Sequence, residues 1–265
     1  KRHTFSGTGN MAEQLDIQAG LYVVATPLGN FGDITLRALH VLKHMPSIAC
    51  EDTRMTRDLL RHLDIPPPEL YSVREHNERT AAEAVVARIA RGEAVAYVSD
   101  AGTPAISDPG ARLVAAVRAA GFPIIPIPGA SAVTTVLSAA GLESTAFTFL
   151  GFAPTSNGEL ATFVDGIAAR TETSVFFESP HRVEKTLPIL AKALPAERRV
   201  VIGRELTKKF ETISATTAGE LMAWLEANAE RMRGEFVVAV EGAPESKRAS
   251  SVDARSLLKA LLQEL

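Results

Sequence analysis

Short apolar runs alternate with longer amphipathic segments along most of this chain. In the first half the apolar runs predict strands and the amphipathic segments predict helices. The expected strands are Leu21–Ala25, Ser47–Cys50, Ala94–Val98 and Ile124–Ile127. The expected helices are Thr35–Lys43, Arg54–Leu63, Thr80–Arg91, Asp108–Gly121 and Ser131–Gly141. Strands that alternate with helices in this way are typical of a parallel α/β sheet.

Polar residues before several of these helices predict where each helix begins. Thr80-Ala-Ala-Glu83 has the pattern of a capping box, and Asp108-Pro109 suits a cap followed by a first turn. Ser131 is the expected cap of the helix that follows the fourth strand.

The second half changes character. Strands are expected near Phe147–Leu150, Ser174–Phe177, Arg199–Gly203, Glu211–Ala215 and Phe236–Val240. Helices are expected near Gly158–Arg170, Val183–Ala193 and Ala218–Arg231. Because the strands near Glu211 and Phe236 flank a single helix, a mixed sheet is expected here.

A domain boundary is expected close to Gly129. The domains would be residues 21–129 and 130–242, after an N-terminal extension, residues 1–20. Met11 is a candidate natural start, and the polar residues 1–10 are a candidate vector-derived segment. Residues 243–265 are expected to form a polar linker and a short amphipathic helix, Asp253–Leu265, that begins a longer helical extension.

Composition narrows the class of protein. Apolar residues make up 46% and charged residues 22% of the 265 residues, as in ordinary globular proteins. No run approaches the roughly 20 apolar residues of a membrane helix, and no signal-peptide core is present, so a cytoplasmic protein is expected. The single cysteine, Cys50, follows an apolar run and is expected to be a buried thiol. No Cys/His cluster has zinc-site spacing, so no metal is expected.

Two strand-to-helix loops are rich in small residues. They are Ser99–Gly110, with the sequence S-D-A-G-T-P-A-I-S-D-P-G, and Pro128–Ser131. Small residues let a ligand approach the backbone, whose free N–H groups at a helix start can bind it. Neither loop has a dinucleotide or triphosphate motif or concentrated positive charge. We therefore expect a cofactor without a pyrophosphate.

Four polar clusters follow apolar strands or lie in nearby loops. They are Glu51–Arg54, Glu75–Arg79, Glu178–Arg182 and Arg204–Lys209. Any one of them is explained by helix caps and surface ion pairs. Together they indicate a polar substrate, because binding residues concentrate on loops.

Nine motifs occur in order between Leu21 and Gly242. They include L-Y-V-V-A-T-P-L-G-N-F-G-D-I-T, A-C-E-D-T-R, H-N-E, V-S-D-A-G-T-P-x-I-S-D-P-G, P-x-P-G-A-S-A, G-F-x-P, F-F-E-S-P-H-R, R-E-L-T-K-K-F-E and G-E-F-V-V-x-V-E-G. This set resembles the tetrapyrrole methylase superfamily and, within it, the bacterial 16S ribosomal RNA 2′-O-ribose methyltransferases. The resemblance implies two α/β domains, a parallel N-terminal sheet and a mixed C-terminal sheet, with S-adenosylmethionine (AdoMet) in the cleft between them.

The resemblance also implies a homodimer that methylates the ribose 2′-hydroxyl of a cytidine in the decoding centre of 16S rRNA, within the assembled small subunit. Carried over by motif, the AdoMet site comprises residues of three loops and two residues of the second domain. They are Leu28, Ser99, Asp100, Ala101, Gly102, Thr103, Ile106, Ser131, Ala132, Phe152 and Ala239.

A ribose hydroxyl is a poor nucleophile near neutral pH, so a positioned base is expected to help. The candidates are Asp52, His76 and Glu78, with Lys208 as an electrostatic aid. Candidate phosphate contacts are Arg54, Arg74, Arg79, Arg182, Arg204 and Lys208. The formal charge of −3 opposes indiscriminate RNA binding and favours recognition of a folded particle by its shape.

One departure bears on the substrate. Superfamily members that act on tetrapyrroles usually carry G-G-D-P where this chain has Ala101-Gly102-Thr103-Pro104. A methyltransferase acting on a tetrapyrrole or another small molecule is therefore the weaker alternative. A second alternative is a non-catalytic, AdoMet-dependent RNA-binding protein.

Overall fold

The computed structural model describes residues 16–74, 76–143, 146–227 and 232–244. The chain divides into two compact units, Lys1–Ala132 and Val133–Leu265, each of which is described by itself. The expected helix Asp253–Leu265 and the expected extension before Asp16 lie outside the described residues. Within the described ranges, no helix is both long and apolar enough to cross a lipid bilayer.

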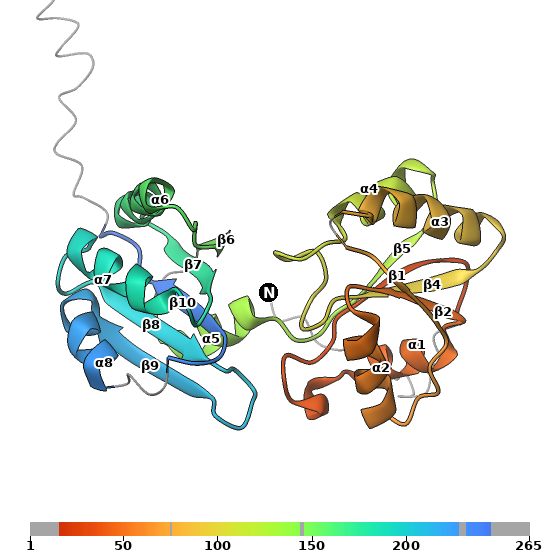
Figure 1. Cartoon of the computed structure of the whole chain (residues 1–265), viewed down its shortest axis with the longest axis horizontal. Helices are drawn as coiled ribbons and strands as arrows, with labels where there is room; N and C mark the ends of the chain where they lie inside the picture. The colour runs from red at the N-terminus through yellow and green to blue at the C-terminus, as the bar shows by residue number, and fades with distance from the viewer. Residues whose placement is uncertain (1–15, 75, 144–145, 228–231, 245–265) are drawn as a thin grey trace, which may run out of the picture. The chain divides into compact units, whose positions relative to one another are not determined.

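The first unit contains a parallel sheet, as the sequence predicted. Its strands are β1 (Gly20–Val24), β2 (Ser47–Cys50), β3 (Glu69–Ser72), β4 (Ala94–Val98) and β5 (Ile124–Ile127). They lie in the order β3-β2-β4-β1-β5, and every neighbouring pair is parallel (Figure 1). β4 is buried at every position because it lies between two strands and two helical layers.

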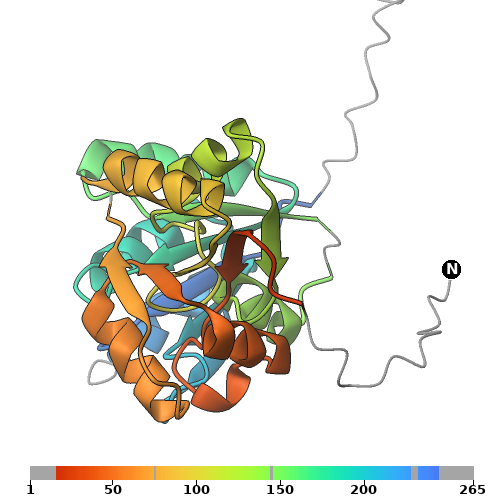
Figure 2. The ribbon, with the colours of Figure 1, turned by 90° about the vertical axis from the view of Figure 1, so that its right-hand side faces the viewer.

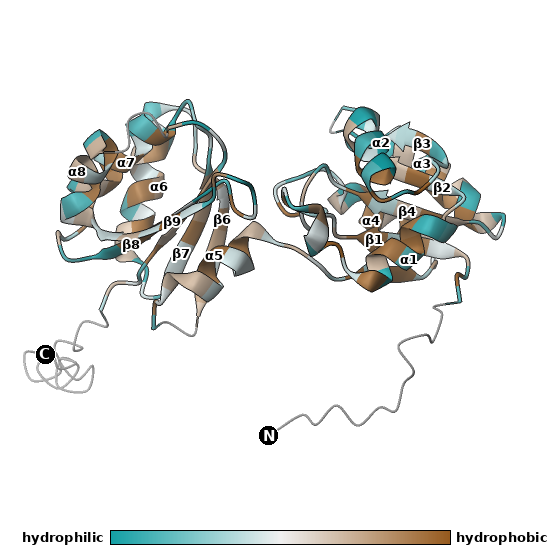
Figure 3. Ribbon diagram, turned by 90° about the horizontal axis from the view of Figure 1, so that it is seen from below, coloured by the Kyte–Doolittle hydropathy of each residue, from teal (hydrophilic) through white to brown (hydrophobic). Residues whose placement is uncertain are grey.

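Helices cover both faces of this sheet. A 3-10 turn η1 (Phe31–Asp33) precedes α1 (Leu36–His44), and the other helices are α2 (Thr53–His62), α3 (Glu78–Ala90) and α4 (Ala111–Ala119). Leu42 of α1 and Leu60 of α2 belong to one apolar core, and Ile89 of α3 and Val117 of α4 belong to the other. Figure 2 shows the two helix pairs on opposite sides of the strands, and Figure 3 shows the hydrophobic colour of β1 and β4.

The edge strand β3 was not predicted. Three prolines, Pro66, Pro67 and Pro68, precede it, and such a run is typical of a break in the chain. Its residues Glu69–Ser72 are half-buried or exposed, since only β2 pairs with them. A short edge strand without a fully apolar face carries a weak hydrophobic pattern.

Two of the expected helix starts are wrong. α3 begins at Glu78 with Asn77 as its N-cap residue, before the expected capping box at Thr80. α4 begins at Ala111 with Gly110 as its N-cap residue, not at Asp108. Gly110 has a φ of 125°, and a Cβ there would overlap the ring of Tyr97. Position 110 therefore admits only glycine, and a side chain elsewhere in the protein has to cap the start of α4.

The second unit contains the expected mixed sheet. Its strands are β6 (Phe147–Phe152), β7 (Thr173–Glu178), β8 (Arg199–Arg204), β9 (Thr212–Thr217) and β10 (Phe236–Val240). They lie in the order β6-β7-β10-β8-β9. β6 and β7 are parallel, whereas β10 is antiparallel to both of its neighbours and β8 is antiparallel to β9.

The helices of the second unit are α5 (Ala132–Ala140), α6 (Asn157–Ala169), α7 (Val183–Ala193), the 3-10 turn η2 (Ala218–Glu220) and α8 (Leu221–Ala227). The segment expected as one helix from Ala218 therefore opens with a 3-10 turn, and its residues 228–231 lie outside the described part. One apolar core contains Phe176 of β7 together with Leu160 of α6 and Leu187 of α7.

Candidate functional site

The connections that leave β1 and β4 run in opposite directions across the parallel sheet. These strands are neighbours, yet β1 leads to α1 on one face and β4 leads to α4 on the other. In open α/β sheets, ligands bind at the carboxyl ends of the strands beside such a switch point. The loops after β1, β4 and β5 all begin at this edge, so the AdoMet residues expected in the first unit lie around it.

Backbone bonds hold these three loops together. Thr26 and Gly102 form an isolated bridge in which each N–H donates to the carbonyl of the other, at 2.9 and 3.1 Å. The Thr26 hydroxyl donates to the Ser99 carbonyl, and the Thr103 hydroxyl donates to the Ala130 carbonyl at 3.0 Å. The site is therefore built largely from main chain.

Two glycines make close approach of the loops possible. Gly102 has a φ of 77°, and a Cβ there would lie 3.1 Å from Leu28 Cδ2. A Cβ at Gly129 would lie 2.9 Å from the Cβ of Ala25. The arrangement is a cradle of small residues that side chains would fill, and it fits a ligand that contacts backbone.

The rest of the second loop is locally strained. Ala105 and Ser107 both have positive φ, at 64° and 63°, on either side of Ile106. Non-glycine residues rarely adopt this conformation, which concentrates at ligand sites. Ile106 is 41% exposed, so an apolar side chain is held toward solvent beside the cradle loops.

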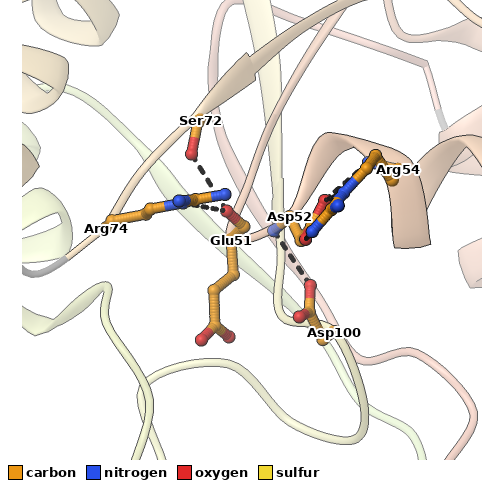
Figure 4. A network of polar contacts seen from close by, with 6 residues as sticks. All are labelled: Glu51, Asp52, Arg54, Ser72, Arg74 and Asp100. Atoms are coloured by element: carbon orange, nitrogen blue, oxygen red, sulfur yellow. Dashed lines mark hydrogen bonds and ion pairs between the residues drawn. The ribbon is translucent and has the colours of Figure 1, made fainter.

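A polar network lies at the same edge, after β2, β3 and β4 (Figure 4). The Asp52 N–H donates to Asp100 Oδ1 at 3.0 Å, and Arg54 binds both carboxylate oxygens of Asp52. Ser72 and Arg74 donate to the carbonyl oxygen of Glu51 at 2.9 and 3.4 Å. The Glu51 carboxylate points the other way, as Figure 4 shows.

The carboxylates of this network differ in pKa. Hydrogen bonds from Arg54 hold the pKa of Asp52 far below its usual range. Loss of solvent raises the pKa of Glu51, and the nearby charge of Asp100 raises it further. Loss of solvent and the charge of Asp52 likewise raise the pKa of Asp100. Neighbouring acids pushed in opposite directions are typical of catalytic sites.

Glu78, an expected base, caps a helix. Its side chain is buried, and Oε1 accepts hydrogen bonds from the N–H groups of Gly110, Arg112 and Leu113 at 2.9, 2.8 and 3.3 Å. These are donors at the start of α4, which has no side-chain cap of its own. Glu78 therefore joins α3 to α4, and this oxygen is fully engaged.

Four other expected residues of the first unit, His76, Arg79, Arg54 and Arg74, are exposed. His76 lies just before α3 and Arg79 is the second residue of that helix, on either side of the Asn77 cap and Glu78. Arg54 and Arg74 belong to the polar network already described. Ser131 and Ala132 lie at the junction between the third loop and α5.

Expected RNA contacts in the second unit are engaged within the protein. Arg182 donates to Ser179, to the Ala153 carbonyl at 2.8 Å and to the buried Glu178 at 2.9 Å. Arg204 donates to the carbonyls of Arg233 and Phe210 at 2.7 and 3.1 Å.

Lys208 also has internal partners, since its ammonium lies 2.9 Å from both Glu205 and Glu235. Burial alone would lower the pKa of Lys208, but these hydrogen bonds outweigh it and raise the pKa. Its positive charge is therefore largely balanced.

Two expected AdoMet residues belong to the second unit. Phe152 ends β6, is half exposed and packs edge-on against Phe177. Ala239 is fully buried in β10, between β7 and β8. Among the described residues, no group of three His, Cys, Asp or Glu side chains is placed to hold a metal ion.

Sequence reasoning did not select Glu51, Ser72 or Thr26. Glu51 could have been selected from the sequence, because it directly follows β2 as Ser99 directly follows β4. The register pairs Cys50 with Val98, so both residues lie at the same edge of the sheet. Thr26 and Ser72 had no comparable indication, since both act through carbonyls distant in sequence.

Comparison with known proteins identifies the class. The family model of tetrapyrrole (corrin/porphyrin) methylases matches residues 20–222. A cobalt precorrin-4 methyltransferase has a similar fold, with a TM-score of 0.60 and 19% identity over 83% of this chain and 94% of that one. The methyltransferase CobJ gives a TM-score of 0.61 with 20% identity over 85% and 95% of the two chains. The fold is that of a methyltransferase.

More similar relatives narrow the family. A protein of Neisseria meningitidis serogroup B is 46% identical over 92% of this chain and 84% of its own length. A protein of Pseudomonas aeruginosa is 42% identical over 92% and 87%. Both are named ribosomal RNA small subunit methyltransferase I. This chain belongs to the tetrapyrrole methylase family and, within it, to the group that carries that name. It is a methyltransferase with AdoMet as methyl donor, as the motifs predicted.

Proposed function

We propose that this enzyme methylates the ribose 2′-hydroxyl of a cytidine in 16S rRNA, within the small ribosomal subunit. The observation that carries the proposal is the carboxyl edge of the parallel sheet. A backbone-lined cradle lies there beside a carboxylate network, and arginines begin the surrounding helices. The names of relatives more than 40% identical over most of the chain support rRNA as the substrate. We also propose that the enzyme is cytoplasmic and acts as a homodimer.

The cradle residues are proposed to hold AdoMet. They are Leu28, Ser99, Asp100, Ala101, Gly102, Thr103, Ile106, Ser131 and Ala132. Bound AdoMet supplies a methyl group on a positively charged sulfur. The protein has to position the hydroxyl in line with that methyl group, and small-residue loops allow the approach.

Glu51 is the proton acceptor that we propose in this site. Asp52 is a poor base, because Arg54 occupies both of its oxygens and lowers its pKa. The Glu51 carboxylate is half-buried, points away from both arginines of the network and has a raised pKa. Asp52 becomes a positioning residue that holds Arg54. His76 is the remaining candidate base.

Replacing Glu51 with glutamine is expected to lower kcat for methyl transfer by about 100-fold. The Asp52→Asn variant is the matched control, and it should lose less. A raised pKa in the folded state means that ionised Glu51 opposes folding. The folded state favours the protonated carboxyl, so the stability contributed by Glu51 is fully present below its unfolded pKa and is lost as pH rises through its folded pKa. Glutamine stays neutral at every pH. E51Q should therefore be more stable than the wild type at pH 7 and lose that advantage in acid, as thermal denaturation will measure. Wild-type kcat in E51Q, or a larger loss in D52N, would remove Glu51 as the base.

Arginines are placed to bind phosphate at this edge. Each of the four α-helices covering the parallel sheet carries arginine at its second position, namely Arg37, Arg54, Arg79 and Arg112. A cation near a helix N-terminus is unfavourable with the helix dipole. All four residues are exposed, and Arg112 forms no ion pair with any described residue. We propose that they contact the rRNA backbone.

Arg112→Ala is expected to weaken binding of small subunits by roughly 5-fold and to lower the salt slope by about 1. Its stability should stay within about 0.5 kcal/mol of wild type, because the Glu78 carboxylate already serves that helix start. Arg118, in the last turn of the same helix, is the control. Arg118→Ala should lose up to about 0.5 kcal/mol of stability and keep full affinity. Equal affinity and salt slope in both variants would exclude this surface.

The whole proposal is tested by methyl transfer. Labelled AdoMet is offered with purified small subunits, free 16S rRNA, or a mixture of tetrapyrroles, and digested RNA is analysed by mass spectrometry. A 2′-O-methylcytidine that forms with small subunits supports the substrate, the atom and the particle together. Label in the tetrapyrrole fraction alone would replace the RNA proposal with the small-molecule one. AdoMet binding without any transfer would favour a non-catalytic binding protein.

A further inference from the structure

The loop between β8 and β9 presents an aromatic ring to solvent. Phe210 is 65% exposed, the largest exposed fraction of any phenylalanine in the described part of the chain. Its neighbour Lys209 is also exposed, with Nζ 5.5 Å from the centre of the Phe210 ring. A single exposed apolar side chain is ordinary on a protein surface, so Phe210 is informative only through the loop that carries it and the lysine beside its ring.

Hydrogen bonds and one buried side chain hold the loop that carries Phe210 against the rest of the unit. Arg204 donates to the Phe210 carbonyl at 3.1 Å, and the Glu211 N–H donates to the Lys208 carbonyl at 3.1 Å. Leu206 is buried and anchors the loop to the unit. Glu205 Oε1 accepts hydrogen bonds from Lys208 and from the Glu235 N–H, both at 2.9 Å.

The loop is also strained. Glu205 and Thr207 have positive φ, at 50° and 67°, although neither is glycine. Such a residue is unfavourable in isolation and persists where the surrounding structure enforces it, often at binding sites. Here the enforced conformation places Lys209 and Phe210 together at the tip.

The charges of the loop point to a polyanion. Lys208 is balanced by Glu205 and Glu235, and Glu211 accepts the Thr207 N–H. Lys209 is the cation left facing solvent beside the ring. An aromatic face next to a free cation is the arrangement with which proteins stack an unpaired base and bind its phosphate.

We propose that Phe210 stacks on an unpaired base of the RNA substrate, with Lys209 binding the adjoining phosphate. The inference rests on the proposed RNA substrate and adds a contact that discriminates single-stranded from paired nucleotides. Stacking needs a π face, whereas a protein interface needs only apolar area. That difference separates an RNA site from a surface that binds a second copy of this chain.

The test measures KM and kcat for methylation of small subunits, and direct binding of 16S rRNA, in four variants. Phe210→Ala is expected to raise KM by about 10-fold, within the range for losing one base stack, with an unchanged salt slope. Phe210→Tyr should stay within about 2-fold of wild type, whereas Phe210→Leu should behave as the alanine variant does. Lys209→Ala should lower the salt slope by about 0.7, as for one contact to a single strand.

Phe147 provides the control, since it is 49% exposed at the start of β6 in the same unit. Phe147→Ala should keep wild-type KM. Wild-type KM and RNA affinity in Phe210→Ala, or full function in Phe210→Leu, would overturn the proposal. So would a change in oligomeric state of Phe210→Ala with RNA affinity intact, which would assign the ring to self-association. If wild-type protein binds RNA but does not methylate it, the proposed reaction fails and the stacking contact is still decided by the affinities.

Discussion

Replacing Gly102 with alanine is expected to weaken AdoMet binding by about 100-fold, equivalent to about 2.7 kcal/mol. The new Cβ would lie 3.1 Å from Leu28 Cδ2, and the backbone φ of 77° is unfavourable for alanine. Gly102 also exchanges both hydrogen bonds of the bridge with Thr26. Any shift that relieves the strain therefore moves two of the three cradle loops. Titration calorimetry with AdoMet measures the effect directly.

Gly121 offers a closely matched control. Its φ is 78°, so alanine meets the same backbone strain, but nothing lies within 4 Å of the new Cβ. Gly121 follows α4 and precedes β5, at the opposite edge of the sheet. Gly121→Ala should lose about 1 kcal/mol of stability from backbone strain alone and bind AdoMet normally. Equal AdoMet affinity in the two variants would show that the cradle is not the cofactor site.

Replacing Glu78 with alanine is expected to lower the free energy of unfolding by about 3 kcal/mol. The three N–H groups that it caps at the start of α4 would lose their shared acceptor within the protein. For a chain of this size the melting temperature should fall by about 6–10 °C. Glutamine keeps an amide oxygen at the same place, so E78Q should recover about half of the loss.

Glu83 is the control, because it is an exposed carboxylate on the same helix. Glu83→Ala should leave the melting temperature within about 1 °C of wild type. At a temperature where E78A remains folded, its kcat should be close to that of wild type, because the carboxylate serves the fold and not the reaction. A variant that melts normally but loses turnover would restore Glu78 as a catalytic base.

Local patterns predicted much of this fold because local physics determines them. The apolar runs at Ala94–Val98 and Ile124–Ile127 are strands at the expected positions, and the strand–helix alternation gives the parallel sheet. The small-residue loops also follow their strands as expected, since βα loops of a parallel sheet gather at one edge. The predictions that failed concern helix caps and side-chain roles that depend on contacts with residues distant in the sequence.

Glu78 and Asp108 illustrate that limit. In sequence, Glu78 follows His76 and Asn77 in a polar cluster typical of a site, whereas Asp108-Pro109 has the local pattern of a cap. The fold reverses the expectation, because the α4 cap comes from a residue more than thirty positions earlier. Tyr97 excludes any side chain from position 110, and its hydroxyl donates to the Pro109 carbonyl, so the chain enters α4 through glycine. No local pattern reports such a contact.

The bridge between Thr26 and Gly102 also affects how quickly the site can work. A loop that orders only when its ligand arrives loses conformational entropy on each binding event, and must loosen again before product leaves. Here paired main-chain bonds within the protein itself join two of the three loops. In the proposed AdoMet site, donor and demethylated product would therefore exchange without remaking this connection. The slow movements of a catalytic cycle would then belong to the large RNA partner, not to these loops.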